Sequence, residues 1–260
     1  MTDQDVITSM DGGVLEIQLN RPTKKNALTT AMYSSIIEAL EKADTDRAVR
    51  VVLITAVGDY FTAGNDLGDF LAVTSGKMDR GEMKGGQFLI GLVDLQKPVI
   101  ALVQGHAVGI GVTMLPHCDL VFVNRDAKLT TPFTNLGLVP EAGSSLTIPS
   151  SIGHAKAYAV LALGEPITGQ EAAILGLANT AGSVPEINSR AREAARSLAK
   201  KPPESLRLTK DLMRNRPAIH AQMRREHDGF AERLKSAEVN EAFAAFMERR
   251  EPDFDKLTRS

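Results

Sequence analysis

The pattern of apolar and polar positions predicts short strands that each lead into a turn and a helix. Residues 14–19 alternate apolar and polar side chains, as a half-buried strand does, and residues 29–43 have the period of an amphipathic helix. The runs 51–54, 99–103 and 120–123 are apolar throughout and carry many β-branched residues, as buried strands do. We therefore expect an α/β fold in which units of strand, turn and helix recur.

The strand signal ends near residue 201. Lys201 is followed by two prolines, which interrupt a helix, and the remainder of the chain is charged and has the period of helices. Apolar side chains that would contact the core or a neighbouring subunit are spread among these charges: Phe230, Leu234, Phe243 and Phe246. We expect two parts, a core of residues 1–200 and a C-terminal helical region of residues 201–260.

Two glycine-punctuated segments each follow one of the buried apolar runs. They are residues 61–67, Phe-Thr-Ala-Gly-Asn-Asp-Leu, and residues 105–111, Gly-His-Ala-Val-Gly-Ile-Gly. Glycine lets the backbone approach a ligand closely, and two converging turns can aim two N–H groups at one oxygen. Each such donor stabilises an enolate or a tetrahedral oxyanion by roughly 2.7–4 kcal/mol. We expect one anion site built from both turns, without a metal or a cofactor.

Other glycine-rich, nucleophilic and metal sites fit these residues poorly. The dinucleotide-binding fingerprint G-x-G-x-x-G would need a glycine at Met114. Residues 143–146, Gly-Ser-Ser-Leu, do not form the G-x-S-x-G elbow of a serine hydrolase. The five histidines show no metal-binding spacing such as H-x-x-x-H. We expect no dinucleotide site, no serine nucleophile and no metal.

Composition limits the partners and the compartment. The 260 residues include 30 basic and 32 acidic side chains, a net charge of −2, which predicts no bulk attraction to nucleic acid or to an anionic membrane. The single cysteine, Cys118, fits a reducing compartment. Residues 1–10 are polar and acidic, unlike a secretory signal, and no apolar run reaches membrane-spanning length. We expect a cytoplasmic protein that binds neither nucleic acid nor membrane.

The two glycine segments resemble the motifs of the crotonase, or enoyl-CoA hydratase/isomerase, superfamily. Its patterns Phe-x-Ala-Gly-x-Asp-Leu and Gly-x-Ala-x-Gly-x-Gly match residues 61–67 and 105–111, and the likeness extends from residues 19–22 to residues 245–252. The resemblance implies a crotonase-like spiral of β-β-α units with a C-terminal helical oligomerisation region, assembled as a trimer or a dimer of trimers. It also implies an acyl-CoA thioester substrate, in which coenzyme A is part of the substrate and no separate cofactor is needed.

The resemblance assigns roles to residues of both turns. The N–H groups of Asn65 and Ile110 would be the two oxyanion donors. Lys24 and Lys25, just before the first helix, would meet a nucleotide phosphate of coenzyme A, or would be merely solvated. The polar segment 72–86 would cover the acyl pocket as a lid, or would be an ordinary surface loop. The residues that the resemblance places against the substrate are Ala63, Gly64, Asn65, Asp66, Leu67, Gly109 and Ile110.

The carboxylates separate two reactions within this superfamily. Hydration of an enoyl thioester is easiest with two carboxylates, and relatives that hydrate carry two glutamates, which match Thr113 and Phe133 here. Neither residue can transfer a proton. A carboxylate follows at Glu141, in residues 140–143, Pro-Glu-Ala-Gly, and this segment resembles the peroxisomal-type 3,2-trans-enoyl-CoA isomerases. In that branch the matching glutamate is the single catalytic base.

A base at Glu141 needs a pKa above that of an exposed carboxyl. We expect an acyl pocket lined by Phe133, Leu136 and Leu138 to raise it by desolvation, whereas a helix starting just after Pro140 would lower it. The expected activity is an acyl-CoA isomerase that moves a double bond from position 3 to position 2 of an enoyl-CoA.

Two alternatives remain open at this point. One is an enoyl-CoA hydratase or another crotonase reaction, in which Glu141 activates water with help from Asp66 or Asp69. The other is a non-catalytic acyl-CoA-binding subunit that keeps the fold and both turns but has lost the chemistry.

Overall fold

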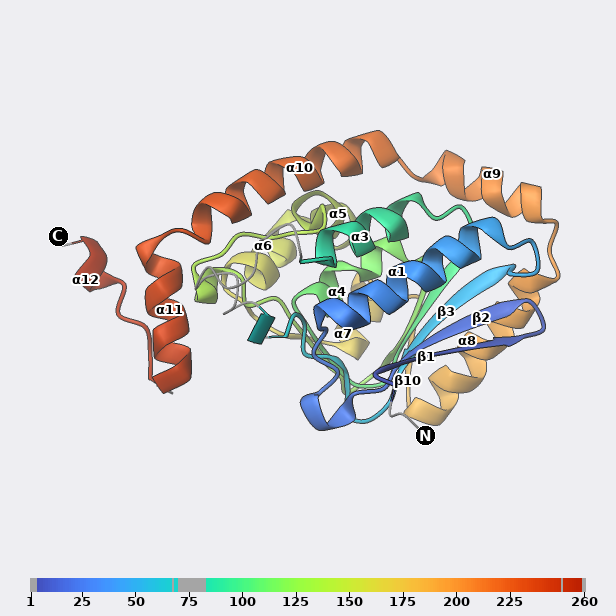
Figure 1. The fold of residues 1–260 in the computed structure, drawn as a ribbon, viewed down its shortest axis with the longest axis horizontal. Coiled ribbons are helices and arrows are strands. Elements are labelled where there is room, and N and C mark those ends of the chain that lie inside the picture. Colours follow the sequence, from blue (N-terminus) through green and yellow to red (C-terminus); the bar gives the residue numbers. More distant parts are fainter. Residues whose placement is uncertain (1–3, 67, 70–82, 249, 259–260) are drawn as a thin grey trace.

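The computed structural model describes residues 4–66, 68–69, 83–248 and 250–258 (Figure 1). Leu67 and most of the expected lid segment, residues 72–82, lie outside the described residues.

A six-stranded sheet forms the centre of the molecule. Its strand order is β1-β2-β3-β5-β7-β10, and only β1 and β2 pair antiparallel. The middle strands β3 and β5 are buried along almost their whole length, which explains their continuous apolar sequence. The strands are β1 Val6–Asp11, β2 Val14–Leu19, β3 Val51–Ala56, β5 Val99–Val103, β7 Leu120–Asn124 and β10 Thr180–Gly182.

A second, four-stranded sheet repeats the order of the first. Its strands run β4-β6-β8-β9, and β4, β6 and β8 are parallel. Each of these three follows a central strand after a few residues, β4 after β3, β6 after β5 and β8 after β7. The expected repeat of strand, strand and helix is thereby confirmed. The strands are β4 Tyr60–Thr62, β6 His106–Val108, β8 Lys128–Thr130 and β9 Ile167–Thr168.

Helices cover both faces of the central sheet. On one face Val51 and Leu53 of β3 pack against Ile187 and Ala191 of α8, while Val52 faces the main core on the other side. Figure 1 shows α1 and α8 on opposite sides of the sheet. The helices of this part of the chain are α1 Thr30–Thr45, α3 Gly85–Asp94, α4 Ile110–Thr113, α5 Ser144–Ile152, α6 His154–Ala162, α7 Gly169–Leu175 and α8 Val184–Ala199, with the 3₁₀ turns η1 Pro22–Lys24, η3 Leu115–His117 and η4 Thr134–Leu136.

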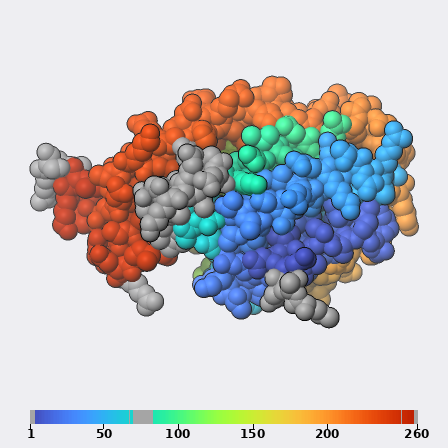
Figure 2. Space-filling view, viewed as in Figure 1, coloured from blue at the N-terminus to red at the C-terminus, as the bar shows by residue number. Residues whose placement is uncertain are grey.

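The C-terminal region is helical, as the sequence predicts. Its helices run along the border of the core, and α11 and α12 lie at one end of the molecule (Figures 1 and 2). Phe243 is buried, Phe230 and Leu234 are partly buried against the core, and Phe246 is 59% exposed. These helices are α9 Pro203–Met213, α10 Arg216–Arg233, α11 Ala237–Glu248 and α12 Asp255–Thr258. The division into two domains at residue 201 stays a prediction.

Candidate active site

The two glycine turns leave the second sheet side by side. Strands β4 and β6 are parallel neighbours, with Thr62 paired to Ala107, so both chains leave the sheet at the same edge. A Cβ on Gly64, whose φ is +89°, would lie 3.1 Å from the carbonyl oxygen of Val108. A Cβ on Gly111 would lie 2.5 Å from Cγ2 of Thr62. Glycine is therefore what lets the turns touch, because any side chain at these positions would separate them.

The backbone of the first turn directs the N–H of Asn65 away from Leu28, its partner in a parallel bridge. Leu28 N–H donates to the carbonyl of Gly64 at 2.8 Å, and Asp66 N–H donates to the carbonyl of Leu28 at 2.9 Å. This is the bonding of a parallel bridge centred on Asn65, in which the central residue's own N–H points to the opposite side. Among the described residues, no backbone acceptor is found for it.

The second predicted donor begins a helix. Ile110 is the first residue of α4, where N–H groups have no partner within the helix. Gly109, with φ +56°, precedes it; its N–H donates to Thr130 and its carbonyl accepts from Val112. No backbone acceptor for the Ile110 N–H occurs in the part of the chain that the structure describes. Within the described residues, then, neither predicted donor has a backbone acceptor, and the role of both as oxyanion donors stays a prediction.

A cavity of about 370 Å³ contains both Asn65 and Glu141. Its wall is mainly apolar and comes from α3 and α10, through Leu89, Met223 and Phe230. The structure therefore brings the first predicted oxyanion turn and the predicted base to one apolar space, although 75 residues of sequence lie between them.

Glu141 lies in the loop just before α5, and its carboxyl has an unusual pKa. Burial raises the pKa from 4.5 to about 7, and the charge of Glu226 adds to the effect. The helix expected just after Pro140 begins only at Ser144. A carboxyl whose pKa is near 7 is ionised often enough at neutral pH to take a proton and, once protonated, is acidic enough to return it.

The turn that carries Glu141 is strained. Ala142 has a φ of +65° and the following Gly143 a φ of +68°. For a residue with a Cβ this left-handed conformation costs about 1–2 kcal/mol. Such a conformation persists only where the surroundings hold it firmly, and it is often found at functional sites.

Tyr33 is a cavity neighbour that the sequence did not single out. It lies on the buried face of α1, and its hydroxyl donates to Oδ1 of Asn65 at 2.6 Å. Burial, followed by the negative charges of Glu141 and Asp69, raises the pKa of this phenol well above its usual value. Tyr33 therefore stays protonated and holds the side chain of the first turn. Nothing in the sequence indicated this role, because Tyr33 occupies an apolar position of the predicted amphipathic helix, as a core residue would.

The expected acyl-pocket residues lie elsewhere. Phe133 and Leu138 are each 6% exposed within the main core, and Leu136 is half-buried against it. None of the three lines the cavity beside Glu141. The apolar wall that desolvates the carboxyl comes from α3 and α10 instead, because α10 returns over the core.

The two candidate lysines are exposed near the first turn. Lys24 ends η1, and the carbonyl of Lys25 accepts from Ala63 N–H at 2.9 Å. The ammonium of Lys25 lies 4.9 Å from the centre of the Tyr60 ring. Lys25 is thus beside Ala63, and the contact of either lysine with coenzyme A stays a prediction.

Both aspartates considered for a hydratase already have partners. The Asp66 carboxylate pairs with Arg21 at 2.6 Å; burial alone would raise its pKa, but Arg21 holds it below the usual value. The Asp69 carboxylate accepts from Thr30 N–H at 2.7 Å, at the start of α1. Neither lines the cavity with Glu141.

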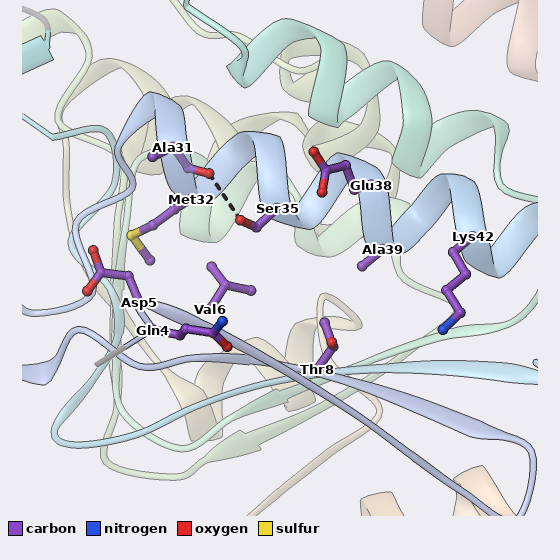
Figure 3. Close-up of a pocket in the computed structure, with 10 residues that line it drawn as sticks. All are labelled: Gln4, Asp5, Val6, Thr8, Ala31, Met32, Ser35, Glu38, Ala39 and Lys42. Carbon is purple, nitrogen blue, oxygen red and sulfur yellow. Dashed lines mark hydrogen bonds between the residues drawn. The ribbon is translucent and has the colours of Figure 1, made fainter. Parts of the chain in front are cut away.

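A second cavity, between β1 and α1, contains none of the predicted site residues (Figure 3). The hydroxyl of Ser35 is turned to the carbonyl of Ala31 within the helix, at 3.3 Å. Within the described residues, no group of three or more His, Cys, Asp or Glu side chains could hold a metal ion. No helix among them is long and apolar enough to cross a membrane.

Fold and site together define a spiral of β-β-α units in which Asn65 and Glu141 line one cavity. The turn before Ile110 touches the Asn65 turn, but Ile110 itself is not among the residues that line this cavity. The chain belongs to the enoyl-CoA hydratase/isomerase family, whose profile matches residues 9–257. It is 37% identical over 251 residues to enoyl-CoA delta isomerase 2 of Rattus norvegicus, covering 94% of this chain and 64% of the rat protein. The chain thus spans less than two thirds of that relative's length.

Solved structures agree with this assignment. An enoyl-CoA hydratase/isomerase from Pseudoalteromonas atlantica T6c superimposes with a TM-score of 0.91 at 38% identity, over 96% of this chain and 100% of the other. Pseudomonas aeruginosa OdaA superimposes with a TM-score of 0.88 at 45% identity, over 95% of this chain and 100% of the other. The crotonase-like fold expected from the glycine motifs is confirmed.

Proposed function

We propose that the protein is an acyl-CoA isomerase that moves a double bond from position 3 to position 2 of an enoyl-CoA. The observation that carries the proposal is one cavity that joins the Asn65 turn to a carboxyl, Glu141, whose pKa is about 7. The rat relative's name, an enoyl-CoA delta isomerase, supports the same reaction.

The reaction needs one base and two donors. The N–H groups of Asn65 and Ile110 would hold the thioester oxygen while the Glu141 carboxylate removes a proton from the carbon next to the carbonyl. The electron pair of that C–H bond moves into the thioester as an enolate, which each donor stabilises by roughly 2.7–4 kcal/mol. The protonated Glu141 then returns the proton to the fourth carbon, so the double bond moves and the atoms balance.

The same carboxyl serves both half-reactions because its pKa is close to neutral. A carboxyl with the usual pKa would be too weak a base for a C–H bond, while one with a much higher pKa would rarely be ionised. Burial in the apolar cavity raises the pKa of Glu141, which is the direction that this reaction needs.

A hydratase is the alternative reaction, and the placement of carboxyls disfavours it. The two positions at which hydrating relatives carry glutamates are Thr113, which is completely buried, and Phe133, which is 6% exposed. A second carboxylate, Glu226, does line the cavity, but both of its oxygens accept hydrogen bonds from the start of α5. It is therefore occupied as an acceptor and is poorly placed to activate a water molecule.

The test follows the product by ultraviolet absorbance. The protein is incubated with 3-enoyl-CoA esters of several chain lengths, and conjugation of the double bond with the thioester is measured. We expect product from the native chain and from Glu165→Gln, an exposed control, but not from Glu141→Gln.

Other outcomes identify the alternatives. Bound CoA esters without conjugated product would indicate a binding subunit. Loss of absorbance from a 2-enoyl-CoA, with a new hydroxyl in the product, would indicate a hydratase. The trimeric or hexameric assembly and the cytoplasmic location stay predictions.

A further inference from the structure

The peptide unit between Ala142 and Gly143, next to Glu141 in the chain, is hydrogen-bonded through both its carbonyl and its N–H. Its carbonyl, that of Ala142, accepts a hydrogen bond from Nε2 of His117 at 2.6 Å. Its N–H, that of Gly143, donates to Oε2 of Glu226 at 2.5 Å. Because the C=O and N–H of a trans peptide point in opposite directions in one plane, the two side chains clamp this unit. They fix the left-handed turn that carries Glu141.

His117 makes this hydrogen bond as a neutral imidazole. The side chain is completely buried, and burial lowers its pKa to about 4. A carbonyl oxygen can only accept, so Nε2 carries the ring proton. His117 ends η3, which directly follows the oxyanion helix α4, and the clamp therefore links the base to the second oxyanion turn.

Glu226 also occupies the N-terminus of α5. Its Oε1 accepts from Ser145 N–H at 2.9 Å and from the Ser145 hydroxyl at 2.5 Å, and Gln222 donates to that hydroxyl at 2.7 Å. Burial raises the pKa of the Glu226 carboxyl above its usual value, and the hydrogen bonds that it accepts from Ser145 and Gly143 offset this rise in part. A helix N-terminus carries a partial positive charge that would stabilise an ionised Glu141 and weaken it as a base. Glu226 offsets that charge.

We propose that Glu226 is a positioning residue for Glu141, which fixes the Ala142–Gly143 peptide together with His117 and offsets the positive N-terminus of α5. The proposal rests on the proposed function, in which Glu141 is the base. It assigns a role to a side chain that the glycine motifs do not reach, from a helix 85 residues further along the chain.

The charged and titratable neighbours of Glu141 support Glu226 as the partner. Besides Glu226, α10 brings His220, Arg224 and His227 to the cavity, and α1 brings Tyr33 close by. Of these, His220 pairs with Asp94 at 2.7 Å. Glu226 is the neighbour whose charge raises the pKa of Glu141, beyond the effect of burial.

The test compares the native chain with Glu226→Gln, which keeps the side-chain shape and removes the charge. Carbon-13 labelling of glutamate carboxyls gives the pKa of Glu141 by NMR titration, with the resonance assigned through Glu141→Gln. We expect the pKa of Glu141 to fall by about one unit in Glu226→Gln, as for removal of a close like charge. The acidic limb of kcat/KM against pH moves by the same amount, and kcat at pH 8 falls roughly three-fold because the base is weaker.

A second variant guards against misfolding of Glu226→Gln. The interaction between two charges is reciprocal, so Glu141→Gln must lower the pKa of Glu226 by the same amount as Glu226→Gln lowers that of Glu141. Glu165→Gln, at an exposed glutamate, serves as the matched control and moves neither pKa.

The two proposals fail in different ways. An unchanged Glu141 pKa in Glu226→Gln, or an unchanged Glu226 pKa in Glu141→Gln, would overturn the role of Glu226 even if the native chain isomerises enoyl-CoA. Reciprocal shifts would support that role. If the pKa shifts are reciprocal but the native chain does not isomerise enoyl-CoA, the role of Glu226 is supported and the proposed function is refuted.

Discussion

Replacing Glu141 by Gln should stabilise the folded protein at neutral and alkaline pH. The folded chain holds the Glu141 proton up to about pH 7, whereas the unfolded chain releases it near the usual value of 4.5. Between these values the folded state binds more protons, so its stability falls as pH rises. Raising a pKa from 4.5 to about 7 corresponds to about 3 kcal/mol. The variant Glu141→Gln has no titratable group at this position, so its stability does not fall in this way as pH rises.

The measurable quantity is how the stability difference between variant and native chain changes with pH. Urea unfolding followed by circular dichroism gives the free energy of unfolding of both proteins at pH 5, 6, 7 and 8, provided that their m-values agree. We expect the difference to grow in favour of Glu141→Gln by about 3 kcal/mol from below pH 5 to above pH 7. The change with pH is the better measure, because the amide also alters contacts at every pH.

Glu165→Gln, an exposed glutamate, provides the control. Its difference from the native chain should stay within about 0.5 kcal/mol across the range. A parallel pair of curves for the native chain and Glu141→Gln would refute the reasoning, since it would mean that burial does not disfavour the charged carboxyl. The chemistry proposed for Glu141 would then lose its physical basis.

Three further predictions concern the frame of the site. In Gly105→Ala the new Cβ would lie 2.1 Å from a backbone oxygen, so thermal melts should show a large loss of stability, whereas Gly86→Ala, with open space around it, should melt close to the native chain. Tyr33→Phe removes the hydrogen bond to the Asn65 side chain, and we expect a loss of about 1 kcal/mol in unfolding free energy together with a lower kcat/KM. Because the pKa of His117 is lowered to about 4, the folded state binds fewer protons than the unfolded state below pH 6.5, and stability falls as pH falls. Urea unfolding of His117→Gln should lack up to about 3 kcal/mol of that acid sensitivity, and an equally steep loss would contradict it.

The long strands and helices could be predicted because burial imposes a pattern on them. Strands β2, β3 and β5 and helix α1 lie where the apolar pattern places them, and Thr29 caps α1 through its side chain. Strands β4 and β6 could not be found in this way, because three residues are too few for a period and each merges into a glycine motif. Their parallel pairing is what brings the two turns together.

The site was predictable only where one short segment determines the geometry. The N–H groups of Asn65 and Ile110 were proposed from the resemblance of two short motifs, and among the described residues neither has a backbone acceptor. The bridge between Asn65 and Leu28, which directs the first of these N–H groups, was not foreseen. The cavity wall was not predictable, since α10 contributes it from far along the chain, and apolar residues near Glu141 in sequence face the core instead. Glu226 sits among many charged residues of α10, and nothing in the sequence distinguishes the one that faces α5.

The placement of the carboxyls explains why a one-base reaction fits this chain. Thr113 lies wholly inside the core, and its hydroxyl has no hydrogen-bond partner among the described residues. A glutamate there would lose its hydration without gaining a donor, so this position favours an uncharged side chain. In the proposed reaction the base comes instead from a loop, where Glu141 lines the cavity while the Ala142–Gly143 peptide beside it is held by His117 and Glu226. Proton removal and return would then fall to one group, which is all that the proposed double-bond shift needs.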